Sequence, residues 1–100
     1  MNNKTYIICE CCSNHRGDLD TALKMIKTAK ECGADAVKFQ AFIPEKVAKD
    51  NKELLDELNK TKFGQVILST LKEYCKLNEI DFICTPFCME TAQMLNEIGL

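Results

Sequence analysis

The chain has 100 residues, of which 46% are hydrophobic and 28% are charged, and its net charge is −2. This composition is typical of one globular domain and excludes a disordered chain. It contains no block of Lys or Arg, no apolar run long enough to cross a bilayer and no signal-peptide core. We therefore expect no nucleic-acid or membrane partner, and a cytoplasmic location.

The chain contains 7 cysteines, which we expect to be reduced thiols rather than a disulfide framework. Their number is odd, and the helix and strand patterns are strong without cross-links. Most of them are predicted to be small hydrophobic residues inside the fold. Cys75 falls on an apolar helix face and Cys84 falls inside a predicted strand.

Strand and helix patterns alternate along the chain. Residues 5–10 predict the first strand, Asp18 or Asp20 can cap the helix that follows, and Gly33 ends that helix. The later predicted elements are a strand over 36–39 or 36–40, a short helix near 53–58, a helix over 64–77, a strand over 81–85 and a helix over 89–98. This alternation is typical of an α/β fold with parallel strands.

Polar groups stand at the end of each predicted strand. The first strand ends at Glu10 and a polar turn over 13–17, the second at Lys38 and Gln40, and the third at residues 85–87. Because the carboxyl ends of parallel strands meet at one edge of a sheet, these groups are expected to share one site. Three strands cannot close a barrel, so we expect residues 1–100 to be the opening segment of a larger fold.

The residue types at this edge indicate anion binding. The ammonium of Lys38 can hold a phosphate or a carboxylate as a point charge, although a lysine stem can also snorkel from a strand edge. Gln40 shares the face of Lys38 by strand alternation. A carboxylate such as Glu10 is costly to bury unless it is paired or functional, and an ion pair with Lys38 is compatible with both.

The two loops add further candidates. Thr85 precedes Pro86, which favours an extended backbone and leaves the Thr85 hydroxyl able to bind an oxyanion, with Phe87 as a wall of the pocket. Asn14 and His15 are expected to shape the first loop and so to hold Glu10, with direct substrate contact by His15 as the alternative.

These motifs together resemble the sialic acid synthase family, which includes N-acetylneuraminate, legionaminate and pseudaminate synthases. The resemblance covers residues 5–100 and rests on Glu10, the Ser13-Asn14-His15-x-Gly17 turn, residues 33–40 and Thr85-Pro86-Phe87. It implies that residues 1–100 are the first three βα units of a TIM (β/α)8 barrel, the amino-terminal portion of the synthase domain. Cys9, Cys11, Cys12 and Cys88 depart from the residues that are common in the family at these positions.

The resemblance also implies an activity. Members are transferases of carbohydrate and polysaccharide biosynthesis that condense phosphoenolpyruvate with an N-acetylated amino-sugar aldehyde, giving a nonulosonic acid and phosphate. The implied catalytic residues are Glu10 and Lys38, and the implied substrate-binding residues are Gln40, Thr85, Asn14, His15 and Phe87. The divalent metal, manganese or magnesium, is expected to have its ligands outside this chain. A full-length homodimer is expected, with a carboxyl-terminal antifreeze-like domain that this chain lacks.

Two alternatives remain open on the sequence. The chain can be a non-catalytic half-barrel remnant or partner subunit, and we expect the isolated 100 residues not to turn over substrate. Cys9, Cys11, Cys12 and His15 can instead belong to a zinc or thiol module, although alternating strand positions point their side chains to opposite faces. The residues present do not select among amino sugars.

Overall fold

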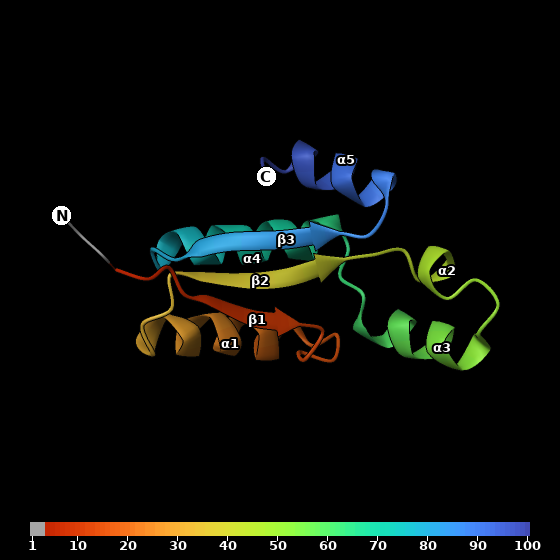
Figure 1. Cartoon of the computed structure of the whole chain (residues 1–100), viewed down its shortest axis with the longest axis horizontal. Coiled ribbons are helices and arrows are strands. Elements are labelled where there is room, and N and C mark those ends of the chain that lie inside the picture. Colours follow the sequence, from red (N-terminus) through yellow and green to blue (C-terminus); the bar gives the residue numbers. More distant parts are fainter. Residues whose placement is uncertain (1–3) are drawn as a thin grey trace.

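A computed structural model of the chain describes residues 4–100 and contains a three-stranded sheet in the order β1-β2-β3. The elements are β1 (Ile8–Cys12), α1 (Leu19–Glu31), β2 (Ala36–Ala41), α2 (Pro44–Val47), α3 (Lys52–Thr61), α4 (Gln65–Leu77), β3 (Asp81–Pro86) and α5 (Met89–Glu97). Both strand pairs are parallel, which confirms the predicted α/β fold. All three arrows in Figure 1 point to the same end, where α2 and α3 lie.

The first helix begins and ends as its sequence predicts. Asp18 is the N-cap, because its carboxylate accepts hydrogen bonds from the backbone N and the hydroxyl of Thr21 at 3.0 and 2.5 Å. The inward face of α1 buries Ala22, Ile26 and Ala29, at the spacing of one helix face. The chain turns back towards the sheet through Gly33, whose φ of +89° favours glycine.

Helices cover one face of the sheet and leave the other accessible. Along β2, Val37, Phe39 and Ala41 are completely buried in the core shared with α1, α4 and α5, and the Phe39 ring lies 5.9 Å from that of Phe82 in β3. The alternate residues Lys38 and Gln40 remain partly exposed. This alternation follows from the strand period of two and separates a core face from a polar face.

The bounds of the first strand differ from the prediction. The strand begins at Ile8 and continues through Cys12, so that Glu10 lies in its middle and not at its end. Before Ile8 the backbone makes loop contacts: Ile7 N donates to the Asp35 carboxylate at 2.8 Å, and Ile7 O accepts from Asp35 N. Cysteine fits a strand as readily as a loop, so the sequence carried no stop signal after Glu10.

The connection after β2 also differs from the prediction of one short helix. It contains α2, which has Pro44 at its first turn, and α3, which is capped by the Asn51 side chain accepting from Leu54 N at 3.1 Å. Figure 1 shows both helices beyond the carboxyl end of β2. The later elements agree with their predicted ranges within two residues.

The prediction that most of the thiols lie inside the fold is only partly correct, because two are buried, four are half-buried and one is exposed. All 7 cysteines lie within the described residues and none forms a disulfide there. Cys75 is buried in α4 and Cys84 is half-buried in β3, whereas Cys32 is exposed at the end of α1. Within residues 4–100, no helix is long and apolar enough to cross a membrane.

Candidate functional site

The centre of the polar face is an ion pair between neighbouring strands. Glu10 and Lys38 are register partners in β1 and β2, and Lys38 Nζ lies 3.2 Å from Glu10 Oε1. Both side chains are accessible, with 36% of Lys38 and 55% of Glu10 exposed. An exposed pair of this kind contributes only about 0–1 kcal/mol to folding, so stability alone gives little reason for it. The predicted ion pair is confirmed.

Gln40 extends this face towards the strand ends. It is the register partner of Thr85 in β3, and Ser13 Oγ of the first loop donates to Gln40 Oε1 at 3.3 Å. Ser13, Gln40 and Thr85 therefore lie in a row at the carboxyl end of the sheet. Hydroxyl and amide groups arranged in this way can donate hydrogen bonds to an anion that the Lys38 ammonium attracts.

The loop after β1 is held in an uncommon backbone conformation. Cys12 and Arg16 have φ values of +48° and +54°, and Gly17 has +78°. A positive φ is costly for a residue with a side chain, so Cys12 occupies a position that favours glycine. The Cys12 thiol lies 3.6 Å from Glu10 Oε2, and its pKa is raised by burial and by this carboxylate.

His15 lies inside this loop and supports it. The residue is 2% exposed, its ring stacks on Phe63 with centroids 3.9 Å apart, and its Nδ1 accepts from Gly17 N at 2.9 Å. Burial lowers the pKa of His15, so the ring is neutral at pH 7, with its proton on Nε2. These contacts match a loop-shaping role, whereas Asn14 is exposed beside it. Direct substrate contact by either residue stays a prediction.

Phe87 lies at the carboxyl end of the sheet, directly after β3. Its backbone N donates to Ala41 O at 3.0 Å, which continues the β2–β3 pairing. The residue is 47% exposed, and its ring lies 6.1 Å from that of Phe42. The Thr91 hydroxyl also accepts from Phe87 N at 3.2 Å and so anchors the start of α5. The structure thus brings Glu10, Lys38, Gln40 and Thr85 onto one face, with Phe87 at its margin.

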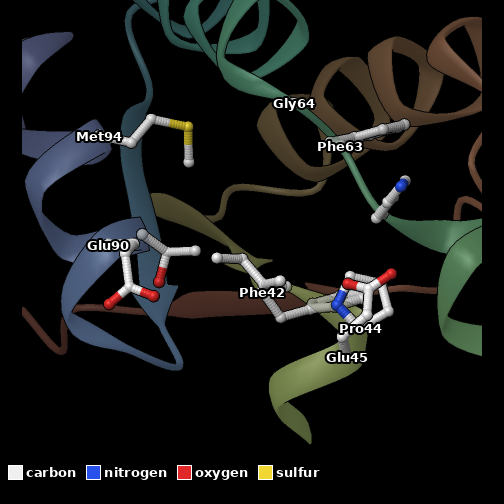
Figure 2. A pocket seen from close by; sticks show the side chains of 10 residues that line it. Phe42, Pro44, Glu45, Phe63, Gly64, Glu90 and Met94 are labelled. Carbon is white, nitrogen blue, oxygen red and sulfur yellow. The ribbon is translucent and has the colours of Figure 1, made fainter. Parts of the chain in front are cut away.

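The cleft shown in Figure 2 is a separate feature. It has a volume of about 380 Å³ and is lined mainly by apolar side chains, among them Phe42 and Pro44 after β2, Phe63 before α4, and Met94 of α5. An ion pair between Lys46 and Glu90 links α2 to α5 beside it. None of the polar-face residues lines this cleft. The sequence analysis, which places only a short helix near residues 53–58 in this connection, does not predict the cleft.

The residues described here do not fit a metal centre. Within residues 4–100, no group of three or more His, Cys, Asp and Glu side chains is arranged to hold a metal ion. Cys9 and Cys11 lie together, but the Cys12 thiol contacts Glu10 and His15 stacks on Phe63, so the four residues of the zinc alternative do not converge on one point. We assign no metal ligand in this part of the chain.

Comparison with known proteins identifies the family. The model of the NeuB family matches residues 25–100. The chain belongs to the NeuB family. Its fold matches a crystal structure of N-acetylneuraminic acid synthetase from Leptospira borgpetersenii with a TM-score of 0.95 and 40% identity, over 98% of this chain and 34% of that one. The three βα units therefore correspond to part of a NeuB TIM barrel.

Characterised NeuB relatives are considerably longer than this chain. The N,N'-diacetyllegionaminic acid synthase of Campylobacter jejuni is 39% identical over 97% of this chain but only 33% of its own length. The N-acetylneuraminate-9-phosphate synthase of Mus musculus is 63% identical over 35 residues. The chain thus spans about a third of the length of such relatives.

Proposed function

We propose that this chain is part of a synthase that condenses phosphoenolpyruvate with an N-acetylated amino-sugar aldehyde to give a nonulosonic acid and phosphate. The observation that carries the proposal is the Glu10–Lys38 pair, 3.2 Å apart in register on the accessible face of the sheet. Membership of the NeuB family and the names of the synthases that match support the reaction class.

Each residue of the polar face has a role in this proposal. The Lys38 ammonium binds the phosphate or carboxylate of phosphoenolpyruvate as a point charge. Gln40 and Thr85 donate hydrogen bonds to the same substrate, since they are register partners next to Lys38. Glu10 keeps Lys38 oriented and contacts the amino sugar near its aldehyde. The two substrates thus meet over neighbouring strands, which favours reaction by proximity.

The surrounding residues shape the site. His15 and Asn14 hold the loop that carries Ser13 towards Gln40, and the ring of Phe87 closes the margin of the pocket. Manganese or magnesium, which the family relation implies, has no ligand set within residues 4–100, so we derive no step through it. We place its ligands, and the contacts of a homodimer, in parts of a cytoplasmic synthase beyond this segment.

The reaction is tested by phosphate release from phosphoenolpyruvate and N-acetylmannosamine, measured with the native gene product. Lys38→Met removes the charge and is expected to lower the rate about 100-fold, the effect typical of losing one electrostatic contact to a developing charge. Lys27→Met is the matched control, because Lys27 is an exposed lysine of α1. Equal rates for the two variants, both above the background without protein, would exclude Lys38 from the reaction.

The segment itself is tested with the same assay. We propose that residues 1–100 form the amino-terminal portion of the barrel and are inactive alone, since the chain spans about a third of the synthases it matches. The isolated chain should release no phosphate above the background without protein. Release by the isolated chain, lost in Lys38→Met, would refute its inactivity while supporting the reaction class.

A further inference from the structure

The core face of β1 carries two thiols that the proposed reaction does not use. Cys9 and Cys11 lie two positions apart and so share one face of the strand, with Sγ atoms 3.9 Å apart. Cys12 belongs to a different environment, since its thiol lies beside the Glu10 carboxylate. Cys9 and Cys11 therefore form a close thiol pair directly behind the polar face.

The pair is reachable from outside. A groove of about 570 Å³ runs between β1 and α1, and both thiols line it together with Met25 and Cys32. Cys9 is half-buried, whereas Cys11 is 1% exposed at the base of the groove. A reagent that enters the groove thus contacts Cys9 first, and the Cys11 thiol lies next to it.

The backbone around the pair is irregular, which helps it to adjust. The β1–β2 register shifts between Glu10 and Cys12, and Cys12 has a φ of +48°. Two positions along a strand span about 6.6 Å, near the upper end of the Cα separations found in disulfides. A bond here needs a small contraction of β1, which a strand interrupted by a bulge accommodates more easily than a regular strand.

We propose that Cys9 and Cys11 are an oxidisable thiol pair that closes into an intramolecular disulfide. The Cys9 thiolate attacks a small disulfide such as oxidised glutathione, which forms a mixed disulfide and releases one glutathione thiolate. The glutathione thiolate released in this step takes the proton of the Cys11 thiol, and the Cys11 sulfur attacks the Cys9 sulfur and displaces the second glutathione. Two electrons pass from the protein to oxidised glutathione, which leaves as two thiols.

Closure would act on Glu10, the residue between the two cysteines. Contraction of β1 at this point moves the backbone that carries the Glu10 carboxylate and so disturbs its ion pair with Lys38. Strained disulfides are the more easily reduced ones, so the change is reversible by thiols. The inference concerns the thiols themselves and stands whether or not the proposed synthase reaction is correct.

The test uses the full chain with Cys12→Ser, which leaves only the two proposed partners in the tryptic peptide spanning 5–16. After oxidised glutathione and alkylation, that peptide is expected to lack two hydrogens and to carry no alkyl group. Adding Cys9→Ala or Cys11→Ala should leave one thiol that is either glutathionylated or alkylated. Adding Cys32→Ala, a thiol of the same groove, should leave closure unchanged.

A second reagent keeps the test independent of oxidation. Phenylarsine oxide bridges two close thiols, forming two arsenic–sulfur bonds and one water, and is expected to add once to the 5–16 peptide of the folded Cys12→Ser chain. Circular dichroism of each variant shows that the fold is retained. The proposal is overturned if folded Cys12→Ser yields only singly glutathionylated or doubly alkylated peptide, or if phenylarsine oxide fails to bridge its two thiols.

Discussion

Gly17→Ala tests how the first loop is fixed against the 41–62 connection. Gly17 has a φ of +78°, and a Cβ at this position would overlap the carbonyl oxygen of Lys60 near the end of α3. The variant therefore meets two separate penalties. One is the left-handed backbone, and the other is a collision with backbone that cannot rotate away as a side chain can.

The magnitude follows from comparison with a second glycine. Gly33 has a φ of +89°, and nothing lies within 4 Å of a Cβ built there. Gly33→Ala should therefore lower the free energy of unfolding only by the cost of the left-handed backbone, about 1–2 kcal/mol. Gly17→Ala should lower the free energy of unfolding by the same backbone cost and by an overpacking cost of about 1–3 kcal/mol, a total of about 2–5 kcal/mol.

Urea denaturation of the two variants and the parent chain measures this difference directly. The midpoint of Gly17→Ala should lie clearly below that of Gly33→Ala, because only the former displaces Lys60. Equal midpoints would refute the claim that the first loop packs tightly against α3. Gly17 would then be needed for its backbone angle alone.

The remaining predictions concern groups whose pKa is shifted by burial. Burial raises the pKa of Cys11, Cys75 and Cys84 from 9.0 to about 12, so these thiols ionise near pH 9 only in the unfolded chain. As the pH rises from 9 to 12, the free energy of unfolding should thus fall by about 1.4 kcal/mol per pH unit for each thiol. A urea midpoint that stays constant across this range would contradict the prediction. Burial lowers the pKa of His15, so stability should instead be lost as pH falls below 6.5. Phe63→Leu removes the stacked ring and should raise this pKa towards 6.5 in an NMR titration of the single histidine, and an unchanged value would exclude Phe63 as the cause of its burial.

The sequence predicted those elements whose signals are local. The apolar spacing and the Asp18 cap defined α1, and the alternation around Lys38 separated a core face from a polar face. The first strand was placed too early because Cys11 and Cys12 carry no clear strand or loop signal. The positive φ at Cys12 was equally hidden, since cysteine rarely marks such a position.

The sequence predicts which site residues share a face of the sheet, because strand periodicity decides this. Alternation predicts that Lys38 and Gln40 share a face, but the register that sets Glu10 against Lys38 and Gln40 against Thr85 depends on how three separate strands pair. Burial of His15 under Phe63 depends on a connection that no short-range pattern places. Tertiary contacts of this kind lie beyond single-sequence reasoning.

The central claim is that the polar face around Lys38 binds phosphoenolpyruvate. Its most direct test is an NMR titration of the isotopically labelled chain with phosphoenolpyruvate, with inorganic phosphate as the reference anion. We predict shifts at Glu10, residues 38–40 and Thr85 that disappear in Lys38→Met and persist in Lys27→Met. Shifts confined to the cleft near Lys46 and Lys62, or none that depend on Lys38, would contradict the account.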